Sequence, residues 1–127
     1  MSYNPLKAPD PKEWLEISEA DRMDLVELFH MRTKVKVPNM KLHVTYHVIV
    51  ENQLAEKHPS AVSALERLMG EGLDRHDAVH AIGNILAVHV FRAFKEKKPM
   101  EQQAYDAELD LLTVDYWYKS NDLTPPK

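Results

Sequence analysis

The longest regular pattern in this chain is an apolar repeat between Asp74 and Lys98. Apolar residues recur there every three or four positions, which is the spacing of one face of an α-helix. They are Val79, Ile82, Leu86, Val90, Phe91 and Phe94. Asp74 can cap the start of this helix, and the lysines of residues 95–98 place positive charge where the helix dipole favours it. The segment therefore predicts a long helix.

Three more segments carry helical signals at their ends. Ser18 can cap a helix that runs to about Arg32, and Ser60 can cap a short helix that ends at residues 70–72, which include two glycines. Pro99 is expected to start a last helix that continues through residues 109–117. With residues 40–56 counted as a helix, these elements predict an all-α fold, a compact bundle of about five helices.

Residues 40–56 fit two structures. Apolar residues alternate with polar ones from Leu42 to Val50, which alone is typical of a half-buried strand. Residues 51–57 continue without a breaker in strong helix formers, and a lone two-stranded hairpin is marginal in an otherwise helical chain. We therefore favour a helix with Asn39 as its N-cap, and a strand is the alternative.

Prolines mark both ends of the chain. Pro5, Pro9 and Pro11 lie within residues 1–13, and Pro125 and Pro126 lie within residues 121–127. Proline at this spacing disfavours regular backbone pairing. We expect a single domain over residues 14–120, with flexible, extended arms at residues 1–13 and 121–127.

The composition excludes several classes of protein. The 127 residues include no cysteine, so disulfides, thiolate metal sites and cysteine nucleophiles are excluded. A formal net charge of -4 argues against nucleic-acid binding, which needs a basic surface. No apolar run approaches the roughly 18 residues of a membrane span, and the N-terminus lacks the apolar stretch of a signal peptide. We expect a cytoplasmic protein without membrane or nucleic-acid partners.

Seven histidines are the main indication of function. On a helix, His43, His47 and Glu51 occupy positions i, i+4 and i+8, a stripe that drifts by about 40° per step. His76 and His80 form a second i, i+4 pair, on the long helix. Two imidazoles one turn apart can bind one metal ion. Two such pairs and a carboxylate therefore predict a metal site between the two helices.

Other interpretations of these and nearby residues stay open. The histidine pairs can also be structural residues that are satisfied by hydrogen bonds. His30 is either a further ligand or, as we favour, a cation stabilised by the C-terminal end of its helix. Arg75 and Asp77 are either partners that orient the ligands or ordinary surface charges. His58 is expected to face solvent in a loop, and His89 should lie on the far side of the long helix.

The two histidine blocks read Leu42-His43-x3-His47-x3-Glu51-Asn52-Gln53-Leu54-Ala55 and Glu71-Gly72-Leu73-Asp74-Arg75-His76-x3-His80-Ala81-Ile82-Gly83. In combination they resemble an uncharacterised bacterial family of small, histidine-rich, all-helical proteins, grouped as a domain of unknown function. The likeness covers roughly residues 11–95. It implies an all-helical fold, and hence a helix at residues 40–56, but it supplies no activity. Relatives often carry Glu where Val88 stands, so the resemblance implies that this chain lacks one possible ligand of a symmetric pair.

The same residues are similar, in geometry only, to helical di-iron proteins of the hemerythrin type. Those proteins use His-x3-Glu on one helix and His-x3-His on the next. Here His47-x3-Glu51 and His76-x3-His80 match that order, and His30 lies on the preceding helix. The expected last helix departs from the pattern because it contains no histidine. Function does not follow from this analogy.

Three functions are consistent with the sequence. The first, which we favour, is a non-haem iron centre, mononuclear or dinuclear, with redox or oxygen chemistry. Zinc and manganese are the alternative metals, and a small molecule or dioxygen would bind at the metal. The second is a structural zinc site that joins two helices through the four paired histidines. The third is a metal-free interaction domain, for example a homodimer formed through Tyr116-Trp117-Tyr118, although that segment can equally cap the domain's own core. Whether the protein is an enzyme stays open, and no catalytic residue is assigned.

Overall fold

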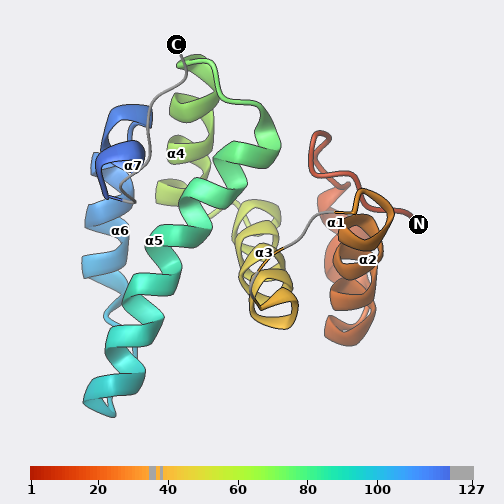
Figure 1. Ribbon diagram of the computed structural model, residues 1–127, viewed down its shortest axis with the longest axis horizontal. Helices are drawn as coiled ribbons and strands as arrows, with labels where there is room; N and C mark the ends of the chain where they lie inside the picture. The colour runs from red at the N-terminus through yellow and green to blue at the C-terminus, as the bar shows by residue number, and fades with distance from the viewer. Residues whose placement is uncertain (35–36, 38, 121–127) are drawn as a thin grey trace.

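The structure is a computed structural model that describes residues 1–34, 37 and 39–120. Over these residues the chain forms helices and no strand (Figure 1). The seven helices of the described part are α1 (Pro11–Glu16), α2 (Glu19–Arg32), α3 (Met40–Ala55), α4 (Pro59–Gly70), α5 (Arg75–Glu96), α6 (Gln102–Leu111) and α7 (Val114–Ser120). The all-α prediction is confirmed, and the segment that also fitted a strand is the helix α3.

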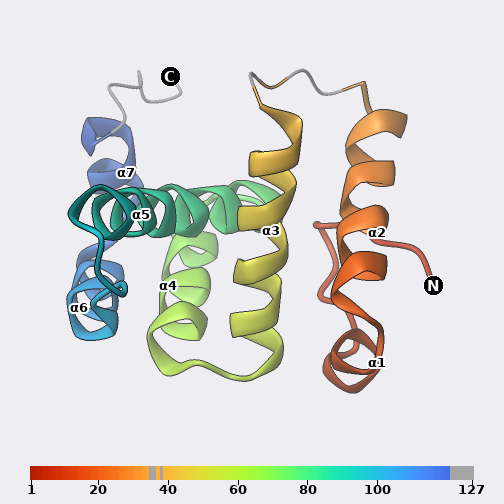
Figure 2. The ribbon, with the colours of Figure 1, turned by 90° about the horizontal axis from the view of Figure 1, so that it is seen from below.

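α3 lies at the centre of the molecule (Figure 2). α2 runs beside it on one side and α4 on the other, while α5 lies across α4 and reaches α3. α6 packs against α4 and α5, and α7 lies at the end of the molecule away from α1 and α2 (Figure 1). The N-terminal part of α5 therefore approaches the α2–α3 pair.

Three helices begin at the N-cap residues that the sequence predicts. Ser18, Asn39 and Asp74 each accept a hydrogen bond from the backbone N–H three residues further on, at the starts of α2, α3 and α5. The start of α4 differs from the expectation, because this helix begins at Pro59 and Ser60 lies inside it. The fixed φ of proline suits the first position of a helix, and proline has no N–H to leave unpaired there.

The number of helices differs from the expected five in two places. α1 begins inside the expected N-terminal arm, with Asp10 as its cap. The expected last helix from Pro99 is instead divided into α6 and α7. Leu112 ends α6 in an extended conformation (φ -71, ψ 119). The hydroxyl of Thr113 then accepts the backbone N–H of Tyr116 at 3.1 Å, which caps a new helix.

The N-terminal residues pack against the helices, so residues 1–13 do not form the extended arm that the prolines suggested. Tyr3 is only 6% exposed, and its ring centroid lies 5.6 Å from that of Trp14 and 6.2 Å from that of Phe29. Burial of an aromatic ring stabilises this segment against α1 and α2 even though its backbone is irregular. The expected C-terminal arm, residues 121–127, lies outside the described residues.

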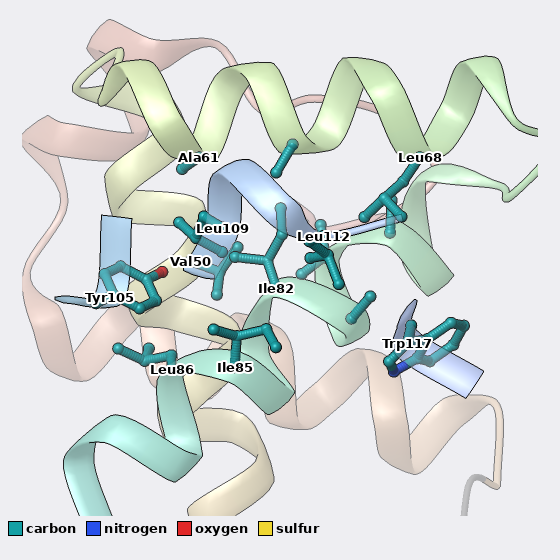
Figure 3. Close-up of a cluster of buried hydrophobic side chains, with 14 residues drawn as sticks. Val50, Ala61, Leu68, Ile82, Ile85, Leu86, Tyr105, Leu109, Leu112 and Trp117 are labelled. Carbon is teal, nitrogen blue, oxygen red and sulfur yellow. The ribbon is translucent and has the colours of Figure 1, made fainter. Parts of the chain in front are cut away.

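Two clusters of buried apolar side chains share α3. The larger one joins α3 to α4, α5, α6 and α7, and it includes Val50, Ile82, Leu109 and Trp117 (Figure 3). The smaller one joins α3 to the N-terminal segment, α1 and α2; its buried members are Tyr3, Trp14, Val26, Val44 and Val48. In the described part of the chain, no helix has the length and apolar character needed to cross a membrane.

Candidate metal centre

Five histidines from three helices gather where α5 meets α2 and α3. His30 comes from α2, His43 and His47 come from α3, and His76 and His80 come from α5. The ring centroids of His76 and His80 lie 4.2 Å apart, one helical turn along α5. The ring of His47 lies 5.3 Å from that of His76 and 5.2 Å from that of His80. The fold thus brings together the two histidine pairs that the sequence singles out.

Four of these residues form a compact group, which we call the four-histidine cluster; they are His30, His47, His76 and His80. One ligand nitrogen from each residue lies within 4.8 Å of the other three. His43 lies beside the cluster, with its Nε2 at 3.0 Å from Nε2 of His30. The structure therefore includes His30 in the group and leaves His43 and Glu51, two of the expected ligands, outside it.

His30 is held by the backbone of its own helix. Its Nδ1 lies 2.8 Å from the carbonyl oxygen of Val26, which can only accept a hydrogen bond, so Nδ1 carries the proton. When the ring is neutral, its Nε2 has a free lone pair that can accept the N–H of His43. The side chain is 0% exposed. His30 thus lies among the histidines of the candidate site, as the first of its two interpretations requires.

His47 is held by Tyr3, which comes from the N-terminal segment. The hydroxyl of Tyr3 donates to Oε2 of Glu51 at 2.5 Å and lies 2.9 Å from Nδ1 of His47. Because the phenol gives its only proton to the carboxylate, its oxygen accepts the N–H of Nδ1. The lone pair of His47 is therefore on Nε2, the atom that faces the other imidazoles.

Glu51 and Arg75 form a buried ion pair behind this tyrosine. Two guanidinium nitrogens of Arg75 donate to the two carboxylate oxygens of Glu51 at 2.8 and 2.7 Å, and the same side chain donates to the carbonyl oxygen of Pro5 at 2.9 Å. Glu51 is 1% exposed and Arg75 is 5% exposed. Of the two interpretations of Arg75, the surface charge is wrong. The hydroxyl of Tyr3 therefore lies between the carboxylate of Glu51 and the imidazole of His47 and contacts both.

Three nitrogen atoms of the cluster lack a partner. Within the described part of the chain, Nε2 of His47, of His76 and of His80 is buried and makes no hydrogen bond. Buried polar atoms are almost always paired, and each unpaired one costs about 1–3 kcal/mol. Three such atoms in a single group call for a common partner that accepts lone pairs, and a metal ion is such a partner.

The pKa values of four of these imidazoles, those of His43, His47, His76 and His80, are lowered, which favours their neutral form. Burial, and then repulsion between neighbouring imidazoles, lowers the pKa of His80 to about 3 and the pKa of His43 to about 4. The same two causes hold the pKa of His47 well below its ordinary value and lower the pKa of His76. A histidine must be neutral to bind a metal ion, so the site keeps its side chains in the form that a ligand needs.

The remaining histidines take part in other contacts. Nε2 of His58 lies 2.7 Å from Oδ1 of Asp106, so this side chain does not simply face solvent as expected. His89 lies away from the cluster, as predicted, and its Nε2 is 2.6 Å from Oε1 of Glu108. Val88, where relatives are expected to carry Glu, is 51% exposed on α5. Asp77, the second residue proposed to orient a ligand, is exposed at the surface.

The contribution of Tyr3 could not be found in the sequence. It lies 44 residues from His47 and 48 residues from Glu51, in a segment where prolines suggested an arm. The only local signal was that it is an aromatic residue in a proline-rich stretch. The role of His30 had a clearer signal, since the sequence already offered it as a further ligand on the helix that precedes His43 and His47.

A family model described as a domain of unknown function, DUF1841, matches residues 17–111 of the chain. The matched region contains all five gathered histidines, together with Glu51 and Arg75, and excludes Tyr3. No curated protein and no solved structure is significantly similar to the chain.

Proposed function

We propose that this protein, which belongs to the DUF1841 family of domains of unknown function, binds a transition-metal ion at the four-histidine cluster. Non-haem iron is the metal we expect first, and zinc and manganese are the alternatives. Four imidazoles suit iron and zinc, and the chain has no cysteine to offer a soft thiolate ligand.

One observation carries the proposal: three buried Nε2 atoms, on two helices, lack any partner within one group of imidazoles. A cation would satisfy all three together with the lone pair of His30. Imidazole nitrogens bind such ions at about 2.0–2.1 Å, so two ligands on opposite sides of an ion lie about 4.2 Å apart. The nitrogens of the cluster lie within 4.8 Å of one another, so small ring rotations would close the site. To leave the lone pair of His30 free for the ion, His43 would have to stop donating its N–H to His30. It could do so by rotating its ring or by moving the proton to its other nitrogen.

The residues around the cluster have a positioning role in this proposal. Ligand histidines commonly donate their other N–H to a group that fixes the ring and raises its basicity. Val26 does this for His30 through its carbonyl oxygen, and Tyr3 does it for His47. Glu51, expected as a ligand, would instead act through Tyr3, and Arg75 would hold the carboxylate of Glu51 in place by two hydrogen bonds.

An iron ion in this site would supply redox chemistry or dioxygen binding, whereas a zinc ion would supply neither. We assign no reaction to the site and no catalytic residue.

A structural zinc site is the second candidate, favoured by the fact that the ligands come from three helices. His30 lies on α2, which belongs to the smaller apolar cluster, whereas His76 and His80 lie on α5, which belongs to the larger one. An ion held by all of them would join the two clusters. Metal bound only by the folded state adds to stability, so this role predicts a large fall in melting temperature on metal removal.

The test is elemental analysis and an absorption spectrum of tag-free protein, before and after reconstitution with iron, zinc or manganese. The proposal predicts about one equivalent of metal in the wild type and less than about a tenth of that in His80→Ala, since a buried ligand is lost.

His30→Ala should behave like His80→Ala, whereas His43→Ala should keep the metal. His58→Ala, far from the cluster, is the matched control. Elemental analysis identifies the metal, and a visible band in the iron-loaded protein would indicate a redox-active iron centre. Metal-free wild-type protein after every reconstitution would refute the proposal.

A further inference from the structure

A small pocket opens beside the cluster, between α3 and α5. Its volume is about 70 Å³, and His43, His47 and His80 form part of its wall. His30 and His76 are not among the residues that line it. The pocket therefore reaches the cluster from one side, and an ion held by the four histidines would be approached from that side.

The size of the pocket limits what can enter. A single water needs roughly 10–15 Å³ measured in the same way, so the space suits a molecule of a few heavy atoms. Small side chains of α5 keep it open: Gly83 and Ala87 lie in the wall one turn apart. A larger organic substrate would not fit without movement of α3 or α5.

The charge around the site favours an anion. Neutral imidazoles would leave the charge of a divalent ion uncompensated, and an uncompensated buried charge is costly. The buried carboxylate nearest to the cluster, that of Glu51, is already neutralised by Arg75. Of the described residues that line the pocket, none is acidic, and two of them, Tyr46 and Asn84, have side chains that can donate an O–H or an N–H.

We propose that this pocket binds a small inorganic anion of two or three heavy atoms, next to the metal ion held by the four-histidine cluster. The inference rests on the proposed function, and it adds the class of ligand and the side from which the ligand enters. The anion would balance the charge of the ion and accept hydrogen bonds from the pocket wall.

Azide is the probe, because it is a linear anion of three atoms whose binding changes the absorption spectrum of iron and cobalt centres. The full-length protein is loaded with iron or cobalt(II), its metal content is measured, and azide is then titrated into it. We expect a saturable spectral change in the millimolar range or below. The variant Ala87→Leu should keep its metal and bind azide about tenfold more weakly, because the added atoms occupy the pocket.

Two further variants make the test specific. Ala93→Leu carries the same substitution on the same helix but lies outside this pocket, so its affinity for azide should equal that of the wild type. Gly83→Ala is the variant to use if Ala87→Leu does not fold. It adds only one methyl group, which would lie at an ordinary contact distance of 3.9 Å from its nearest neighbours. It should weaken azide binding by a smaller factor than Ala87→Leu.

The outcomes separate the two proposals. A protein that takes up no metal refutes the proposed function and this inference with it. A protein with full metal content whose spectrum is unchanged by azide overturns this inference alone. The same conclusion follows if the Ala87→Leu and Ala93→Leu variants bind azide with equal affinity.

Discussion

The hydroxyl of Tyr3 lies 2.9 Å from Nδ1 of His47, although 44 residues separate them in the chain. This contact connects the N-terminal segment to the four-histidine cluster. It also connects the cluster to the buried pair of Glu51 and Arg75, because the same hydroxyl donates to Glu51. The orientation of a proposed metal ligand thus depends on residues from the N-terminal segment, α3 and α5.

Removing the hydroxyl with Tyr3→Phe should weaken metal binding. The substitution keeps the buried ring but leaves Nδ1 of His47 without a partner. Loss of such an orienting group typically costs about 10–100-fold in metal affinity, and the unpaired nitrogen costs about 1–3 kcal/mol of stability. Competition with a chromophoric chelator measures the affinity, and urea unfolding measures the stability. Tyr118→Phe, in α7, is the control, and equal affinities for the two variants would show that Tyr3 does not position His47.

Breaking the ion pair with Arg75→Met should destabilise the fold strongly. Glu51 would remain buried with an uncompensated charge, and loss of one partner from such a pair costs about 3–5 kcal/mol. The double variant Glu51→Gln with Arg75→Met removes both charges, so it should recover part of this loss. Denaturant unfolding of the three proteins gives the free energies. If the double variant were no more stable than Arg75→Met, an unpaired charge on Glu51 would not be the cause.

The metal-free protein should lose stability as the pH falls below about 6.5. The pKa of His80 is lowered from 6.5 to about 3 and that of His43 to about 4 in the folded state. Between pH 6.5 and these values the unfolded chain takes up protons that the folded chain does not, so acid favours unfolding. The stability is fully present above pH 6.5. Urea unfolding at pH 7.5, 6.0 and 5.0 in the presence of chelator measures the effect. His80→Phe should show a shallower dependence on pH, and a slope equal to that of the wild type would contradict the burial of a neutral His80.

Gly83→Ala should stabilise the protein by about 0.5–1 kcal/mol, since alanine is the better helix former. A Cβ at this position would lie 3.9 Å from Cβ of Tyr46 and from Cγ2 of Val50, which is ordinary contact. Gly72→Ala provides the opposite case, because Gly72 has a φ of +108 that an alanine adopts only with strain. Thermal unfolding should therefore move the melting temperature up for Gly83→Ala and down for Gly72→Ala. A decrease for Gly83→Ala would mean that α3 and α5 lie closer together at this point.

Local signals in the sequence predicted α2, α3, α4 and α5 and identified the two histidine pairs, but they did not predict α1. The apolar spacing of α5 and the caps at Ser18, Asn39 and Asp74 depend on neighbours within a few residues, so they can be recognised without the fold. The division between α6 and α7 was missed, because it depends on the extended conformation of Leu112 and on a capping hydroxyl two residues before Asp115.

The membership of the cluster depends on packing between helices, so the sequence predicted it only in part. The i, i+4, i+8 spacing places Glu51 on the stripe of His43 and His47, but it contains no information about Arg75, which pairs with Glu51 across the α3–α5 contact. His30 belongs to a different helix, and only the packing of α2 against α3 brings it to the cluster. Tyr3 is the extreme case, since nothing near it in the sequence indicates its contact with His47.

The most direct measurement is a crystal structure of the reconstituted protein with anomalous diffraction data at the absorption edge of the bound metal. The account predicts one anomalous peak about 2.0–2.2 Å from Nε2 of His30, His47, His76 and His80, with Glu51 still paired to Arg75. A peak coordinated by Glu51 or His43 in place of one of these four residues, or no peak near the cluster in metal-loaded crystals, would contradict it.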